Sequence, residues 1–218
     1  MARFPLPRWL APLTFGLCAV LLVAGCTITS QRPLIAAREG VTPLPDAFVL
    51  FPYEKGPDGY VRTADAAADF TRVGNHYESA NLPDLKGSLA LQLVPAGDAF
   101  LLGAREPTSP AMTYGFARYE DGVLTLWLSP DGDTAAALAR ARHGAMPKET
   151  KALASVVIHP RTDAITVRSR AALDALADLF TAGRLPMSPP SVAYLSEDRN
   201  ATPPSRLVPS GTEWIKVP

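Results

Sequence analysis

Short apolar segments separated by compact turns run through most of the chain and constrain its fold more than any other feature. The clearest case joins residues 112–119 to residues 123–128 through Glu120-Asp121-Gly122, a turn that suits a β-hairpin. Similar segments lie at 48–53, 60–63, 70–73, 76–79, 89–94, 100–104, 155–159 and 164–167. Strands joined by such short turns pair with their neighbours in the chain, so the pattern predicts an antiparallel meander.

The residues along 123–128 indicate what surrounds this sheet. Leu124, Leu126 and Leu128 share one face, and the opposite face, with Val123 and Trp127, is also largely apolar. A sheet that is apolar on both faces must be covered on each side, or must curl towards a barrel so that one face lines its interior.

One strongly amphipathic helix is expected after the strands. Ser169 suits its N-cap and Gly183 its end. Between them a single apolar stripe is formed by Ala172, Leu173, Leu176, Leu179 and Phe180. A shorter helix is expected over 134–143. The fold class predicted is therefore α+β, an antiparallel meander sheet, flat or curled into a barrel-like shape, with one main amphipathic helix packed on it.

The N-terminus has the pattern of a secretory leader. Arg3 and Arg8 provide positive charge without an acidic residue, and an apolar run follows from 10 to 24. That run is shorter than the roughly 20 residues that a membrane-spanning helix needs. It ends at Val23-Ala24-Gly25-Cys26, where small residues stand directly before a cysteine.

This tetrapeptide resembles the lipobox of bacterial lipoproteins. The resemblance covers only about residues 1–27, and it implies that the leader is removed before Cys26, that the Cys26 thiol carries a diacylglyceryl group, and that the new amine is acylated, typically by palmitate. Thr27, rather than Asp, follows the cysteine, which in that class favours the periplasmic face of the outer membrane over the inner membrane. The alternative is an ordinary signal peptide or an uncleaved anchor, in which Cys26 is incidental.

The remaining chain is divided by composition. Residues 1–25 are expected to be the removed signal peptide, and 26–46 the lipidated cysteine and a tether with three prolines and no periodicity. A first strand around 34–37 is the alternative for part of that tether. Residues 47–218 are expected to form one domain with a proline-rich C-terminal segment, in which 192–195 and 214–217 are short edge strands and the stretch between them is an exposed loop.

The composition excludes two broad classes. The chain is 47% hydrophobic, which is too apolar for a disordered protein. It carries 21 basic and 21 acidic residues, so it lacks the basic field on which nucleic-acid binding relies. No nucleic-acid partner is expected.

The sequence contains no established catalytic or ligand-binding motif. His76, His143 and His159 are at least 16 residues apart, unlike the closely spaced ligands of common zinc motifs. Nucleophile elbows and phosphate-binding glycine loops are absent from the sequence. We therefore predict no catalytic, cofactor-binding or metal-binding residue, no cofactor, and a role that is more in keeping with binding than with catalysis.

These features lead to one functional hypothesis and two alternatives. The hypothesis is a lipid-anchored cell-envelope protein that binds or scaffolds a ligand or an envelope protein in the periplasm, held to membrane lipid through acylated Cys26. One alternative is an envelope hydrolase whose active residues come from distant loops. The other is an accessory subunit of an outer-membrane assembly, for which an exposed strand edge near 214–217 is expected.

Overall fold

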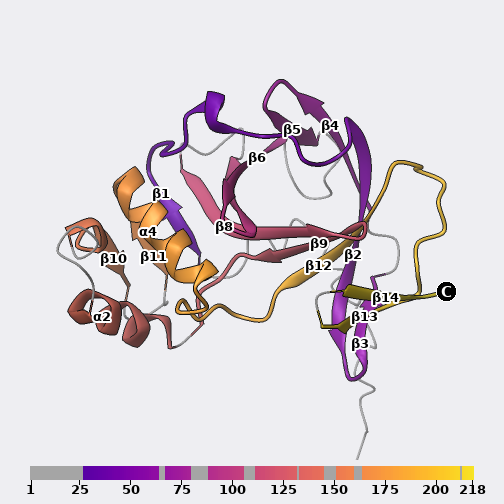
Figure 1. Cartoon of the computed structure of the whole chain (residues 1–218). Helices are drawn as coiled ribbons and strands as arrows, with labels where there is room; N and C mark the ends of the chain where they lie inside the picture. The colour runs from indigo at the N-terminus through magenta and orange to yellow at the C-terminus, as the bar shows by residue number, and fades with distance from the viewer. Residues whose placement is uncertain are drawn as a thin grey trace, which may run out of the picture.

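Eight antiparallel strands join edge to edge and close into a barrel (Figure 1). The computed structural model describes residues 27–63, 67–79, 88–105, 111–131, 133–144, 151–159, 164–211 and 213–218. The barrel strands, in their order around it, are β2 (Ala47–Gly56), β4 (Ala68–Val73), β5 (His76–Ser79), β6 (Leu89–Ala96), β7 (Ala99–Arg105), β8 (Met112–Glu120), β9 (Val123–Trp127) and β12 (Ser191–Ser196). β12 pairs with both β9 and β2 and thereby closes the ring.

The predicted fold class is confirmed, and the curled form of the sheet is the one observed. The hairpins expected from their turns form, including β8–β9, in which Phe116 lies opposite Trp127 and Glu120 opposite Val123. Both faces of β9 are apolar because one lines the barrel interior and the other is covered by further elements.

The interior of the barrel is a packed hydrophobic core. Side chains at alternate positions of each strand point inward, as the period of two along a strand requires. They include Phe48, Phe70, Tyr77, Leu91, Leu93, Leu102, Leu124, Leu126 and Leu195. The cavity that remains among the described residues is only about 20 Å³ and is lined by apolar side chains and Tyr77. The barrel interior therefore supplies rigidity and leaves no room for a ligand.

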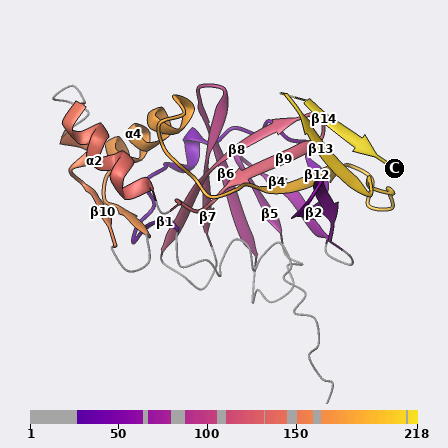
Figure 2. The same cartoon turned by 90° about the horizontal axis from the view of Figure 1, so that it is seen from below.

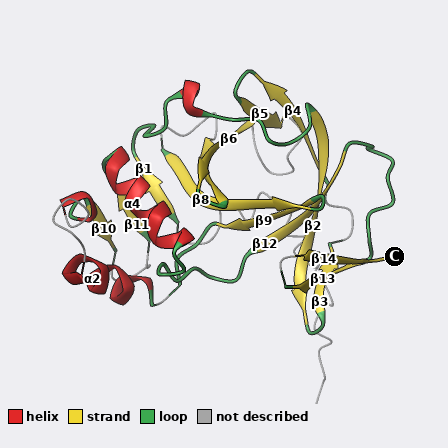
Figure 3. Ribbon diagram, in the orientation of Figure 1, coloured by secondary structure: helices red, strands yellow, loops and turns green. Residues whose placement is uncertain are grey.

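A second layer covers one outer side of the barrel. It consists of α4 (Arg170–Thr181), α2 (Thr134–Gly144) and the strands β1 (Ile28–Ser30), β11 (Ile165–Val167) and β10 (Val156–Ile158), which extend the sheet beyond β8. Figure 3 shows both α-helices on this side. α4 begins where predicted, since the Ser169 hydroxyl accepts a hydrogen bond from Ala172 N at 3.2 Å. Its Phe180 stacks on Phe116 of β8 with ring centroids 4.2 Å apart.

The opposite outer side is covered by strands instead of helices. β3 (Gly59–Arg62) pairs with β2, and β13 (Arg206–Ser210) pairs with β3 and with β14 (Glu213–Val217). The stretch between 195 and 214, expected to be an exposed loop, thus contains a strand. Leu207 explains the difference, because it is fully buried against a small outer core although its proline-rich neighbourhood suggests a loop.

The expected tether is the larger correction. Residues 27–46 belong to the folded body. β1 lies between β8 and β11, with Ile28 opposite both Tyr114 and Ile165, and Ile28 is fully buried. Farther along, Ile35 and Leu44 are also buried. No periodicity marks this segment because its apolar residues contact different elements, so they follow no single face.

Buried tyrosines make the fold sensitive to alkaline pH. Burial raises the pKa of Tyr53 to about 12, and it also raises the pKa values of Tyr77 and Tyr114. A tyrosine in the unfolded chain titrates near pH 10. Because the pKa is higher in the folded state, the contribution of each neutral tyrosine to the free energy of unfolding is complete below pH 10. It is lost as the pH rises towards the pKa of that tyrosine in the folded state.

We therefore expect the free energy of unfolding to fall steeply between about pH 10 and 12, with about 2–3 kcal/mol attributable to Tyr53 alone. Urea unfolding across this range measures it. Tyr53→Phe should reduce the pH dependence. An unfolding free energy that stays constant up to pH 12 contradicts the assignment.

Candidate functional site

The N-terminal strap, residues 31–46, crosses the outer face of β6–β8 and forms one wall of the candidate site. The Tyr114 hydroxyl of β8 accepts a hydrogen bond from Leu34 N at 2.8 Å. The Gln92 amide of β6 donates to the Ala36 and Ala37 carbonyls at 2.8 and 3.3 Å. These bonds hold the strap at a fixed distance from the strands.

The second half of the strap is fixed in the same way. Arg170 of α4 forms an ion pair with Glu39 in the 3₁₀ helix η1 (Ala37–Glu39). Val41 N donates to the Leu93 carbonyl at 2.8 Å. A Cβ on Gly40 would lie 2.2 Å from the Asn75 carbonyl oxygen, so the close approach of the strap to the β4–β5 turn requires glycine here.

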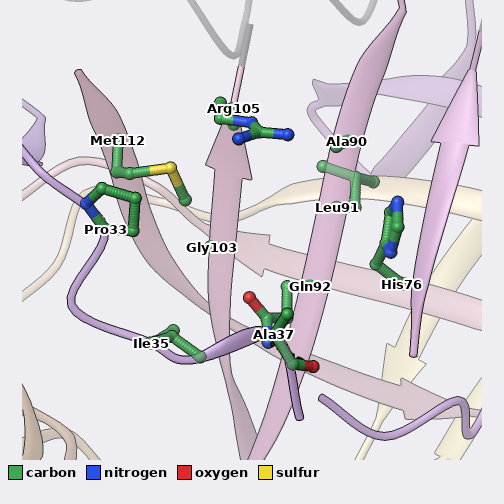
Figure 4. Close-up of a pocket in the computed structure, with 10 residues that line it drawn as sticks. All are labelled: Pro33, Ile35, Ala37, His76, Ala90, Leu91, Gln92, Gly103, Arg105 and Met112. Carbon is green, nitrogen blue, oxygen red and sulfur yellow. Dashed lines mark hydrogen bonds between the residues drawn. The ribbon is translucent and has the colours of Figure 1, made fainter. Parts of the chain in front are cut away.

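A pocket of about 220 Å³ lies between the strap and the sheet (Figure 4). Pro33 and Ile35 contribute apolar surface from the strap, and Met112 contributes it from β8. The opposite side comes from β5 and β6, where His76 and Gln92 line the pocket. Figure 4 labels ten residues that line the pocket.

Gly103 forms the floor of the pocket. A Cβ at this position would lie 3.4 Å from Ile35 Cδ1 and 3.6 Å from Met112 Cε, which are ordinary contact distances. Its backbone is not in the left-handed region, so conformational freedom does not explain the glycine. Glycine inside a strand costs stability and often marks a place where another group approaches closely. Here its missing side chain leaves space under the strap.

Arg105 provides the positive charge of the pocket. It follows Gly103 on the same face of β7, two residues along. Its guanidinium is exposed and forms no hydrogen bond or ion pair with another described residue. His76 is engaged by comparison, because its Nε2 lies 2.8 Å from Glu78 Oε1. The pocket thus combines apolar walls with one guanidinium at its rim, an arrangement that suits a small anion with an apolar part.

A second hollow lies between α2 and the end of α4. It is larger, about 390 Å³, and Arg140 and Arg184 line it. Both arginines are exposed. We favour the strap pocket as the site because three different elements and a floor glycine shape it, whereas this hollow is a gap between two helices.

The three histidines are not brought together. His76 lies on β5, His143 in α2 and His159 just after β10, where its Nε2 is 2.9 Å from Thr166 Oγ1. Among the described residues, no group of three or more His, Cys, Asp or Glu side chains converges on a point that could hold a metal. Of the described residues that line the pocket, His76 is the one His, Cys, Asp or Glu, and it contacts Glu78 beside the pocket; none of the described lining residues is serine, threonine or cysteine.

Sequence reasoning did not identify the pocket residues. In the sequence, Arg105 looks like an ordinary surface residue at the end of a strand. Gln92 and Tyr114 form hydrogen bonds with the strap, a segment whose sequence suggests a tether. The one available signal was Gly103, a glycine within the apolar segment 100–104.

Cys26, the predicted lipidation site, lies outside the described residues. The next residue, Thr27, is described, and its carbonyl accepts a hydrogen bond from Ile165 N at 2.9 Å. Within the described part of the chain, none of the helices has the length and hydropathy needed to span a bilayer. No protein-family model, curated protein or solved structure matches this chain.

Proposed function

We propose that this chain is a lipid-anchored cell-envelope protein whose barrel body is a binding module, with the strap pocket as its ligand site. The proposed anchor is an acylated Cys26 after removal of residues 1–25, and the proposed location is the periplasmic face of the outer membrane. The proposed ligand is a small molecule with a carboxylate or a similar anionic group and a short apolar part.

The anchor is supported by the sequence at 22–27 and by the charge of the mature chain. Removal of residues 1–25 takes Arg3 and Arg8 from the 21 basic residues and leaves 19, against 21 acidic residues. A body with a slightly negative net charge has no general electrostatic attraction to anionic lipid. Stable residence at a membrane therefore depends on the acyl chains, each buried CH₂ of which contributes about 0.8 kcal/mol.

The binding role is supported by one observation, a pocket lined by Gly103 beside the Arg105 guanidinium, which pairs with no other described residue. The closed, filled barrel makes the strand side of this pocket rigid. The strap, which forms the other wall, is fixed by hydrogen bonds to Tyr114 of β8 and to Gln92 of β6. Sites built on rigid elements lose little entropy when they bind a ligand.

A second candidate role is that of an accessory subunit in an outer-membrane assembly. Among the described strands, β14 is the last in the sheet and pairs on one side only, with β13. Nearby, Ile215 is 53% exposed and Val61 is 49% exposed. An exposed strand edge with apolar side chains is a surface to which a partner can add a strand.

The binding role is tested with hexanoate as the anionic probe and hexylammonium as the matched cation, by calorimetry on the body that begins at Thr27. Hexanoate should bind and hexylammonium should not. Arg105→Gln should weaken hexanoate binding about 10- to 100-fold, since a hydrogen bond to a charged group contributes about 1.5–3 kcal/mol.

Two further variants separate the pocket from the general surface. Gly103→Ala places a methyl group in the pocket at contact distances that the fold tolerates, so it should weaken binding without lowering the melting temperature greatly. Arg184→Gln removes an exposed arginine from the other hollow and should bind as the parent does. Equal binding of both probes, or unchanged binding by Arg105→Gln, would rule out this ligand class.

A further inference from the structure

The folded body begins immediately after the residue proposed to carry the lipid. The Thr27 carbonyl accepts a hydrogen bond from Ile165 N at 2.9 Å. The next residue, Ile28, is fully buried and is paired on both sides, with Ile165 of β11 and Tyr114 of β8. The start of the chain is therefore held in the sheet and cannot act as a spacer.

The absence of a spacer sets the distance to the membrane. A flexible tether of 20 residues would let the body stand about 25 Å away on average. Cys26 is instead joined to Thr27 by one peptide bond, which separates their Cα atoms by about 3.8 Å. A larger separation would require β1 to leave the sheet, which would expose Ile28 and break its pairing with two strands.

From this we infer that the lipidated protein rests directly on the lipid headgroups at the place where Thr27 meets the start of β11, with Ala164 and His159 as the nearest described residues. This inference depends on the proposed lipid anchor. Ala164 is half-buried and His159 is exposed, and His159 N donates a hydrogen bond to the Ala164 carbonyl at 2.9 Å across the hairpin. Ile158 and Thr166 lie next to them.

This placement orients the rest of the molecule. β10 and β14 are the two ends of the strand path, and Figures 1 and 2 both show them at opposite ends of the body. With the β10–β11 end on the membrane, the β13–β14 hairpin is held away from it. The strap pocket lies nearer the membrane than the β13–β14 hairpin does. Met112 in the pocket wall is paired with Ser30, which ends the three-residue strand β1 that starts next to Thr27.

The mature protein offers a direct way to measure this orientation. Cys18 belongs to the leader and Cys26 carries the lipid, so one added cysteine is the only reactive thiol. A fluorophore is attached in His159→Cys, at the proposed contact, and in Ser210→Cys, in the distant β13–β14 hairpin. The full lipidated protein is reconstituted in phosphatidylglycerol/phosphatidylethanolamine vesicles that contain a lipid with a nitroxide on its headgroup, and quenching is recorded.

We expect strong quenching at position 159 and weak quenching at position 210. A second form carries a twelve-residue Gly/Ser segment and an added threonine between Cys26 and Thr27, a spacer that spans about 20 Å on average. The spacer should reduce quenching at position 159 to nearly the value at position 210. Equal quenching at the two positions without the spacer, or an unchanged value at 159 with it, would overturn the inference.

Mass spectrometry of each preparation separates this result from failure of the proposed anchor. If Cys26 is acylated and the two positions are quenched equally, the anchor stands and the orientation is wrong. If Cys26 is not acylated and the protein does not join the vesicles, the anchor and the orientation both fail.

Discussion

A protein that begins at Ala47 is expected to lose its cooperative fold, although the composition suggests that 47–218 is the complete domain. The truncation removes the buried side chains of Ile28, Ile35 and Leu44. Burial of such side chains contributes about 1.5–3 kcal/mol each, and a whole domain is stable by only about 5–15 kcal/mol. The loss is therefore comparable with the total stability.

The truncation also breaks polar contacts and strand pairing. The Tyr77 hydroxyl, buried in the barrel, exchanges hydrogen bonds with the Leu44 backbone at 2.8 Å, and the Tyr114 hydroxyl accepts one from Leu34. Both would lose these partners, and a buried polar group without a partner costs about 1–3 kcal/mol. β11 would lose β1, which is its link to the barrel sheet.

Urea unfolding followed by circular dichroism measures this effect. The body that begins at Thr27 is the matched control and should give one sharp transition. The form that begins at Ala47 should give a shallow curve or no transition. A transition from 47–218 with the same midpoint and slope as the control would show that the strap and β1 do not stabilise the barrel.

Cys26→Ser is expected to move the protein completely from the envelope pellet to the soluble fraction or to leave it as an uncleaved precursor. Serine has no thiol to accept the diacylglyceryl group, and the slightly acidic body has no other strong attraction to anionic lipid. Fractionation followed by immunoblotting measures the distribution. Cys18→Ser, which lies within the proposed leader, is the matched control and should remain in the pellet. Retention of Cys26→Ser in the pellet at the mature size would contradict lipid anchoring at this residue.

The hairpins and the main helix could be predicted because their signals are local. Gly74-Asn75 and Asp121-Gly122 connect adjacent strands at turns where Gly74, Asp121 and Gly122 adopt positive φ. The Ser169 cap and the apolar stripe of α4 likewise lie within one turn or one helix. In each case the residues that interact are neighbours in the sequence.

Closure of the barrel and the position of the strap could not be predicted, since they depend on distant residues. β12 pairs with β2, which places Val192 opposite Tyr53 although the two are well over a hundred residues apart in the sequence. The sequence of β12 does not specify which strands it will pair with. The strap contacts are single hydrogen bonds to Tyr114 and Gln92 that leave no periodic pattern. Arg105 becomes a site residue only because Gly103 and the strap leave space beside it.

The mass of the N-terminal peptide of the native protein, taken from its own envelope, decides whether Cys26 carries the lipid. We expect a peptide that begins at Cys26 and carries a diacylglyceryl group on sulfur and an acyl chain on its amine. A peptide that begins elsewhere, or a mature Cys26 with an unmodified thiol, would contradict the lipid anchor and the membrane orientation that depends on it.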